Sequence, residues 1–380
     1  MSGRIVLVAG HGDLGGGEVM LLACADALTA VGMEPVVVAP TAPSHVLSAA
    51  RCAGHATVEV PTHPEDPWWR AARATRRAVA GVRAQDAGAP VWCHGLRPVV
   101  ATAGIPGRIA HVHRVPTRAQ MPVLAAAAAG SRAVVVPSES TRGFLPRHLA
   151  RRAHVLGNWS EDTSLGPGTR GDHDGAPAAE PFDATAPRGR RTGEPPVVGY
   201  LGRIAPEKGL VDLVKAVELL DEQGVALRPV VRVGGEALFV SEEQAEELSR
   251  AMGRLGARLH REGWVQRRDF LSRVDVLVCP SRVPESFGLV AAEAMAAGVP
   301  VVVTDAGALP EVVGPDHPWV AGVEDPVSLA CVLRQALGAL GTEAGEHAVA
   351  RARRRWEALW SPAAGRERVA GLLRDLGILP

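Results

Sequence analysis

At 380 residues the chain is longer than one hydrophobic core usually serves, so two domains are expected. Its 41 basic and 41 acidic residues cancel, which argues against a nucleic-acid partner bound through bulk positive charge. The five cysteines form no Cys-x-x-Cys pair, and no apolar stretch reaches the length of a membrane-spanning helix. We therefore expect a cytoplasmic protein with no signal peptide, transmembrane segment or disulfide frame.

The first half of the chain alternates strand patterns with helical patterns. The strand patterns are Ile5–Ala9, Val36–Ala39, Val58–Val60, Val91–His94, Ile109–Val112 and Ala133–Pro137, and helical patterns between them include Glu18–Ala30, Trp68–Ala84 and Arg118–Ala129. This alternation predicts a doubly wound, Rossmann-like sheet. We assign residues 1–158 to this first domain.

The loop after the first strand pattern contains two overlapping glycine motifs. Gly10–Gly15 satisfies the G-x-G-x-x-G dinucleotide pattern, but the next strand pattern ends in Ala39-Pro40, where a dehydrogenase carries an acidic residue. We therefore favour a glycine loop in which Gly16 and Gly17 let the backbone approach a ligand. A tight turn into a helix remains the alternative for each glycine.

Three histidines stand at or near the ends of neighbouring strand patterns. His94 ends one pattern, and His111 and His113 end the next. A zinc site is conceivable, but no matching cysteine or carboxylate spacing supports it. We expect no bound metal.

The segment Trp68–Arg83 is a basic helical pattern that begins with two tryptophans. Such a helix could dock onto a membrane surface. A solvated helix over the core explains the pattern equally well, so both interpretations stay open.

A region without periodicity separates the two halves. Residues 159–196 are rich in Gly, Pro, Ala, Asp and Arg, which indicates a linker or a mobile loop. Asp172-His173-Asp174 resembles an Asp-x-Asp metal motif, but no strand pattern precedes it, so we discount it.

Residues 197–355 resume the alternation and predict a second Rossmann-like domain. Within it, residues 274–303 predict a strand, a loop, a helix and a second strand, with Glu285 in the loop and Glu293 eight residues later on the helix. The start of such a helix lies at the ligand-binding edge of a parallel sheet and favours anions. Two carboxylates beside an anion site suit a ligand that is phosphorylated and rich in hydroxyl groups, such as a nucleotide sugar.

Three segments together resemble family 4 of the retaining glycosyltransferases, also called glycosyl transferases group 1. They are residues 280–313, the stretch Gly199–Gly209 with Arg203 and Lys208 five residues apart, and Gly15–Glu18. The resemblance implies the GT-B architecture, in which two Rossmann-like doubly wound domains face each other across a cleft. It implies an acceptor-side first domain, a donor-binding second domain, and C-terminal helices, about 356–380, that cross back to the first.

The resemblance also implies roles for individual residues. Arg203 and Lys208 would stabilise the departing diphosphate, Glu285 and His113 would border the transferred sugar, and Glu293 would bind the ribose. The implied donor-binding set is Gly16, Gly17, Arg203, Lys208, Ser286, Phe287, Gly288, Leu289, Val290 and Glu293, and the acceptor side would include His94, Glu18 and His113. Neither a metal nor a cofactor is required, because the two cations neutralise the diphosphate and the nucleotide sugar is a substrate.

We thus predict a hexosyltransferase that moves a sugar from a nucleoside diphosphate sugar, first of all a UDP-sugar, to a hydroxyl of a small polar acceptor, as in secondary-metabolite biosynthesis. Three alternatives stay open: a lipid-linked or cell-envelope glycan acceptor, a GT-B epimerase or phosphorylase, and a non-catalytic binding module. Base recognition also stays open, because Gly234–Phe239 stands where relatives carry a Gly-Asp-Gly turn.

Overall fold

The computed structural model describes residues 3–164, 194–222, 228–237 and 240–379. The chain divides into two compact units, which we call unit 1 and unit 2. Unit 1 contains Met1–Trp159 and Pro362–Pro380, and unit 2 contains Ser160–Ser361.

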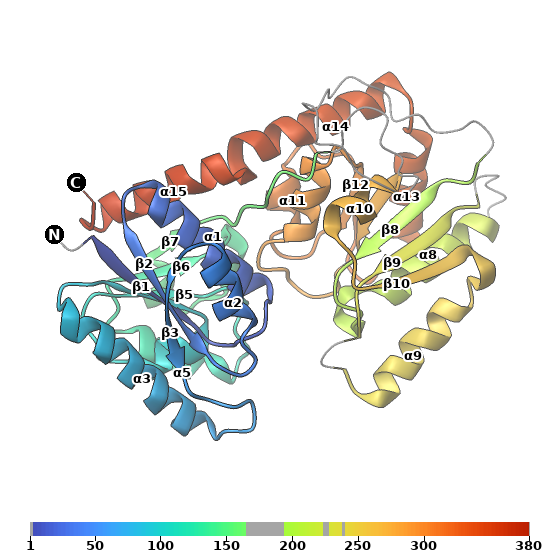
Figure 1. Cartoon of the computed structure of the whole chain (residues 1–380). Helices are drawn as coiled ribbons and strands as arrows, with labels where there is room; N and C mark the ends of the chain where they lie inside the picture. The colour runs from blue at the N-terminus through green and yellow to red at the C-terminus, as the bar shows by residue number, and fades with distance from the viewer. Residues whose placement is uncertain (1–2, 165–193, 223–227, 238–239, 380) are drawn as a thin grey trace. The chain divides into compact units, whose positions relative to one another are not determined.

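Unit 1 is built on a seven-stranded parallel sheet in the order β3-β2-β1-β4-β5-β6-β7 (Figure 1). The strands are β1 (Arg4–Ala9), β2 (Glu34–Pro40), β3 (Ala56–Val60), β4 (Val91–His94), β5 (Arg108–His111), β6 (Ala133–Val136) and β7 (Ala153–Val155). Their central residues are Val-rich and buried, as both faces of a parallel sheet are covered.

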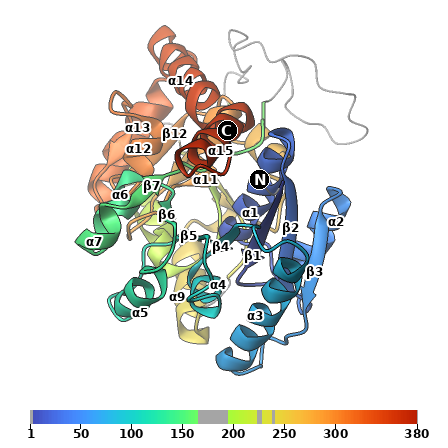
Figure 2. The same cartoon turned by 90° about the vertical axis from the view of Figure 1, so that its left-hand side faces the viewer.

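Helices cover both faces of this sheet, with α1 and α15 on one face and α3, α4 and α5 on the other (Figure 2). The helices of unit 1 are α1 (Gly16–Ala30), α2 (His45–Cys52), α3 (Trp68–Gln85), α4 (Leu96–Ala101), α5 (Gln120–Ala128), α6 (Glu139–Phe144), α7 (Arg147–Ala150) and α15 (Pro362–Asp375). The last of these packs against α1, although it is more than three hundred residues away in the chain.

Unit 2 has a six-stranded parallel sheet in the order β10-β9-β8-β11-β12-β13. Its strands are β8 (Val197–Leu201), β9 (Val230–Gly234), β10 (Leu259–Gly263), β11 (Val276–Cys279), β12 (Val301–Thr304) and β13 (Val320–Ala321). Its helices are η1 (Pro206–Lys208), α8 (Leu210–Glu222), α9 (Glu242–Gly253), η2 (Gly256–Arg258), α10 (Arg267–Ser272), α11 (Leu289–Ala296), α12 (Leu309–Val313), α13 (Pro326–Gly338), α14 (Glu343–Arg355) and the π-helical turn η3 (Trp356–Trp360).

Each sheet has one position where the strand order reverses. It lies between β1 and β4 in unit 1 and between β8 and β11 in unit 2. In doubly wound sheets, ligands bind beyond the carboxyl ends of the strands at this position. The loops that follow these four strands are therefore where a binding site is expected.

The predicted fold class, two Rossmann-like α/β domains, is confirmed. The sequence pattern missed β7, β10 and β13, each of which is an edge strand of its sheet. β7 and β10 are only partly buried, and β10 reads Leu-His-Arg-Glu-Gly, so neither has the apolar run of a central strand. β13 has only two residues, Val320–Ala321, too few for a strand pattern. The predicted break at Ser361-Pro362 is confirmed, and the residues that return to unit 1 begin at Pro362, where about 356 was expected.

Some expectations concern residues outside the described ranges. They are the linker residues 165–193, with Asp172-His173-Asp174 among them, and the pair 238–239. Among the helices that the structure does describe, none has the length and apolar character needed to cross a membrane.

Candidate functional site

A tight turn after β8 carries the two predicted cations of unit 2. Pro206 opens the η1 turn, and Gly209 closes it with a left-handed φ of 73°. A Cβ atom on Gly209 would lie 1.7 Å from the carbonyl oxygen of Pro280, in the loop after β11. Only glycine allows this contact, so the turn that ends in Lys208 lies directly against that loop.

Lys208 contacts one of the two predicted carboxylates. Its Nζ lies 2.6 Å from Oε1 of Glu285, and the Ser281 hydroxyl donates to the same oxygen. The backbone of Glu285 is fixed as well, because its carbonyl accepts a hydrogen bond of 2.9 Å from the N–H of Ala308. An ammonium held in this way is oriented for an anionic ligand, which would compete with Glu285 for it.

Arg203 lies two residues after the end of β8 and forms an ion pair with Glu207. Its carbonyl accepts a hydrogen bond of 2.6 Å from the buried Tyr200 hydroxyl, which fixes the start of the loop. The structure therefore brings both predicted cations to the carboxyl end of β8.

The α11 helix starts at the same edge of the sheet. Its N-cap is Gly288, with φ of 107°, and a Cβ atom there would lie 2.5 Å from Leu309 Cδ2. The first N–H groups of a helix have no intrahelical acceptor, so Leu289 and Val290 can offer theirs to an anion. The Phe287 ring packs edge-to-face on Trp360 with a 5.0 Å centroid distance, so its side chain belongs to the core. Ser286 is half-buried beside it.

Glu293 is a buried carboxylate on α11. It is 5% exposed on α11, and Oε1 lies 2.9 Å from Nε of Arg267, the first residue of α10. Its Oε2 is buried and accepts no hydrogen bond from any described residue. Burial raises the pKa of Glu293 to about 7, although the charge of Arg267 acts to lower it. A buried acceptor without a partner indicates a place where a ligand donor, such as a hydroxyl, completes the site.

In unit 1 the first turn of α1, the last residue of β4 and the loop after β5 bring three predicted residues together. His94 Nδ1 and His113 Nε2 are 2.8 Å apart, and both rings are buried. A Cβ atom on Gly17 would lie 3.5 Å from the His113 side chain, so the first turn of α1 packs closely on it. Burial lowers the pKa of His113 to about 3, which keeps the imidazole neutral near pH 7. It can therefore exchange hydrogen bonds with a sugar but does not act as a stored proton source.

His111 completes a cluster with these two histidines. Its ring centroid lies 3.9 Å from that of His113 with the two rings tilted by 34°, and neither of its nitrogens has a described partner. One donor atom from each of His94, His111 and His113 lies within 4.8 Å of the others, so this group could hold a metal ion. The group contains no carboxylate or thiol.

Gly16 and Glu18 lie in the first turn of α1 on either side of Gly17, with Gly16 exposed and Glu18 partly buried. Burial raises the pKa of Glu18, whose carboxylate also interacts with the backbone of Gly15. Among the described contacts, none joins Glu18 to the histidines, so its acceptor-side role stays a prediction.

Comparison with known proteins identifies unit 2. A family model described as glycosyl transferases group 1 matches residues 195–338. Unit 2 is a group 1 glycosyltransferase domain. An alpha-maltose-1-phosphate synthase from Mycolicibacterium smegmatis is 31% identical over 169 residues, which are 43% of this chain and 40% of that protein. A D-inositol 3-phosphate glycosyltransferase from Xylanimonas cellulosilytica is 38% identical over 184 residues, which are 45% of this chain and 42% of that protein.

These alignments span well under half the length of the curated relatives, whereas structural similarity extends over the whole chain. HepE from Anabaena, solved with UDP and glucose, has a TM-score of 0.76 at 18% identity and covers 98% of this chain and 99% of its own. Sucrose-phosphate synthase from Thermosynechococcus elongatus has a TM-score of 0.75 at 20% identity and covers 98% of this chain and 99% of its own. Together with the glycosyltransferase domain, this similarity shows that the fold is GT-B.

Two residues that contact the predicted carboxylates of unit 2 were not predicted from the sequence. Ser281 donates to Glu285, and Arg267 is paired with Glu293. Ser281 directly follows Pro280 at the end of a strand pattern, so its position was a usable signal. Arg267 carried no signal, because arginine accounts for nearly all of the chain's 41 basic residues.

Proposed function

We propose that the protein is a retaining glycosyltransferase that moves a hexosyl group from a UDP-sugar to a hydroxyl of a small polar acceptor. The observation that carries this proposal is Glu293, a buried carboxylate whose Oε2 has no described partner, on the helix that starts beside Lys208 and Glu285. It offers an acceptor for ribose hydroxyls close to a cation for phosphate.

The diphosphate would take the place next to Lys208 and Arg203. Negative charge develops on the phosphate oxygen as its bond to the anomeric carbon breaks, so fixed cations stabilise the transition state more than the ground state. The first N–H groups of α11 add to this stabilisation. On this proposal Lys208 exchanges its contact with Glu285 for one with the diphosphate, and Glu285 is released toward the sugar.

Retention would follow from attack on the same face as the leaving group. The bond from the anomeric carbon to the phosphate oxygen breaks, and the bond to the acceptor oxygen forms. The acceptor proton passes to the departing phosphate oxygen, so the step needs no protein nucleophile. The neutral His113 of unit 1 would accept or donate a hydrogen bond at the transferred sugar, with His94 fixing its ring.

The substrate class is supported by the names of similar proteins. HepE was solved with UDP-glucose, and the curated relatives are named for a maltose phosphate product and an inositol phosphate substrate. These names favour a UDP-sugar donor and a polar, hydroxyl-rich acceptor.

The first experiment is a thermal-shift titration with UDP, GDP, ADP and dTDP, with and without magnesium. We expect a metal-independent rise in Tm with UDP, which follows from binding to the folded state alone. No shift with any nucleotide would contradict the donor site. Release of UDP from a UDP-sugar only when a polyol acceptor is present, with the anomeric configuration read by NMR, then tests transfer and retention. Turnover without an acceptor would instead indicate an epimerase or a hydrolase.

A further inference from the structure

The exposed face of α3 in unit 1 carries positive charge that described carboxylates leave largely unpaired. The helix has five arginines and no acidic residue in its 18 positions. Val79 and Val82 are its buried residues, and the opposite side exposes Trp69, Arg73 and Ala80, which share one face at helical spacing. Arg70 pairs with Asp66 at 3.1 Å, but the other four arginines have no described carboxylate within ion-pair distance.

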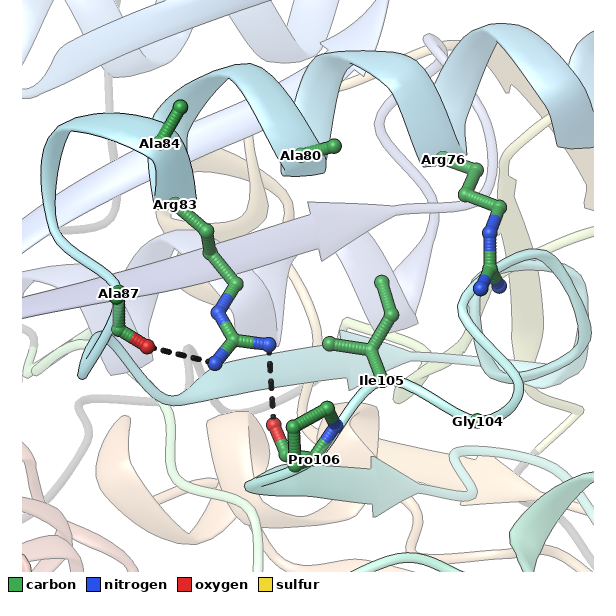
Figure 3. Close-up of a pocket in the computed structure, with 8 residues that line it drawn as sticks. All are labelled: Arg76, Ala80, Arg83, Ala84, Ala87, Gly104, Ile105 and Pro106. Atoms are coloured by element: carbon green, nitrogen blue, oxygen red, sulfur yellow. Dashed lines mark hydrogen bonds between the residues drawn. The ribbon is translucent and has the colours of Figure 1, made fainter.

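Two of these arginines border a hollow of about 390 Å³ between α3 and the loop 104–106 (Figure 3). Arg83 donates to the carbonyl oxygens of Ala87 at 2.7 Å and Pro106 at 3.3 Å. Arg76 donates to the carbonyl oxygen of Ala103 at 2.7 Å. Backbone carbonyls are neutral, so they hold the two guanidinium groups in place without neutralising the positive charge. The hollow therefore attracts an anion.

Apolar groups line the hollow between its charged ends. The Ile105 side chain lies between Arg76 and Arg83 (Figure 3), and Ala80 and Ala84 of α3 also line the hollow. A ligand that matches this surface combines an anionic group with a hydrocarbon part. A phospholipid headgroup with its glycerol and upper acyl carbons has this chemistry.

The N-terminal end of α3 adds two large indole rings. Trp68 is 69% exposed and Trp69 is 46% exposed. The guanidinium groups of Arg73 and Arg70 lie 5.2 Å and 5.8 Å from the centre of the Trp69 ring. Tryptophan prefers the boundary between lipid headgroups and hydrocarbon, and arginine beside it contacts phosphate.

We propose that α3, with the hollow beside its C-terminal half, docks unit 1 onto an anionic phospholipid bilayer. The helix would lie flat, with both tryptophans in the interfacial region and Arg76 and Arg83 around a headgroup phosphate. The indole rings and the alanine-rich wall favour a bilayer over nucleic acid, which offers phosphates but no apolar phase. This inference does not depend on the transfer reaction.

The test uses the full chain and vesicles of phosphatidylcholine with 0 or 30% phosphatidylglycerol. Cosedimentation should show binding to the anionic vesicles and little to the neutral ones. Raising NaCl from 0.1 to 1 M should weaken binding, because it shortens the Debye length from about 10 to about 3 Å.

Paired variants locate the contact. Since each arginine at an anionic surface contributes about 1 kcal/mol, or about fivefold, R76Q/R83Q should lower the vesicle partition coefficient about 25-fold. R73Q/R77Q removes two arginines that make no described hydrogen bond and should act similarly without disturbing the loop. The matched control is R147Q/R151Q on the exposed surface at α7, which should bind like the wild type.

The tryptophans are tested in the same way. W68A/W69A should lower partitioning by at least about tenfold, because two indoles leave the interface. W264A in unit 2, whose side chain is 72% exposed, is the matched control. No binding of the wild type to anionic vesicles, equal losses in the α3 variants and their controls, or binding to an RNA oligonucleotide in preference to vesicles would each overturn the proposal.

Discussion

Replacing Glu293 by glutamine tests whether this carboxylate costs stability in the absence of a ligand. Burial raises its pKa from 4.5 to about 7, and Arg267 only partly offsets this effect. Because the folded state holds the proton more tightly than the unfolded chain, ionisation of Glu293 destabilises the fold. The cost is absent below about pH 4.5, grows as the pH rises, and is complete above about pH 7.

The size of the effect follows from the two pKa values. At about 1.4 kcal/mol per pH unit, the cost at high pH is about 3 kcal/mol. Glutamine has nearly the same shape and cannot ionise, so Glu293→Gln should unfold at a higher temperature than the wild type at pH 8.5. For a domain the size of unit 2, each kcal/mol raises Tm by about 2–4 °C. The difference should become small at pH 5.

The assay is thermal unfolding of both proteins at pH 5 and pH 8.5, with Glu246→Gln on the exposed side of α9 as the control. The same substitution should weaken UDP binding, since Oε2 is the proposed acceptor for ribose. Arg267→Ala should extend the loss of stability to higher pH and enlarge it, because the folded-state pKa of Glu293 loses its lowering influence while the unfolded-state pKa is unchanged. Identical pH dependence of wild type and Glu293→Gln would refute the reasoning.

Two further substitutions probe the turn after β8. Lys208→Ala should lower turnover about 10²–10³-fold, because it removes a cation at the leaving group. The control Lys215→Ala, at an exposed position of α8, should keep normal turnover. Equal kinetics for the two variants would contradict the proposed role of Lys208. Gly209→Ala should destabilise unit 2 by at least about 2 kcal/mol in urea unfolding, since its Cβ would lie 1.7 Å from the Pro280 oxygen. Gly253→Ala at the end of α9 meets nothing within 4 Å and is the control, so the reasoning fails if the two variants unfold alike.

The central strands and several of the long helices could be predicted from sequence because their patterns are strong. The expected strand Val197–Leu201 is β8 itself, and the helix expected at Leu289–Ala297 is α11 with one residue less. The apolar, β-branched composition of such strands reflects burial on both faces, which a pattern reports directly. Edge strands such as β7 lack this burial and therefore this pattern.

For the candidate site, the sequence predicted the residues that belong to motifs but not the contacts between distant elements. Lys208 and Glu285 were expected at one sheet edge, and the structure adds that they contact each other. The pairing of Arg267 with Glu293 joins α10 to α11 across 26 positions of sequence and depends on packing that no local pattern encodes. His94 and His113 were expected near the ends of neighbouring strands, and the structure adds that their ring nitrogens lie 2.8 Å apart.

The two places where the chain passes between the units have a consequence for its synthesis. They lie at Trp159–Ser160 and Ser361–Pro362, and the Ser160 N–H donates to the Trp360 carbonyl at 3.0 Å beside them. The second crossing returns the chain to unit 1, where α15 packs against α1 and completes the fold of the unit. Gly365 of α15 packs so closely on Trp159 that a Cβ atom there would lie 2.3 Å from the indole. During translation, all of unit 2 is made before residues 362–379 leave the ribosome. The part of the chain that emerges first is thus the last to complete its fold, and nascent unit 1 exposes the surface of α1 until then.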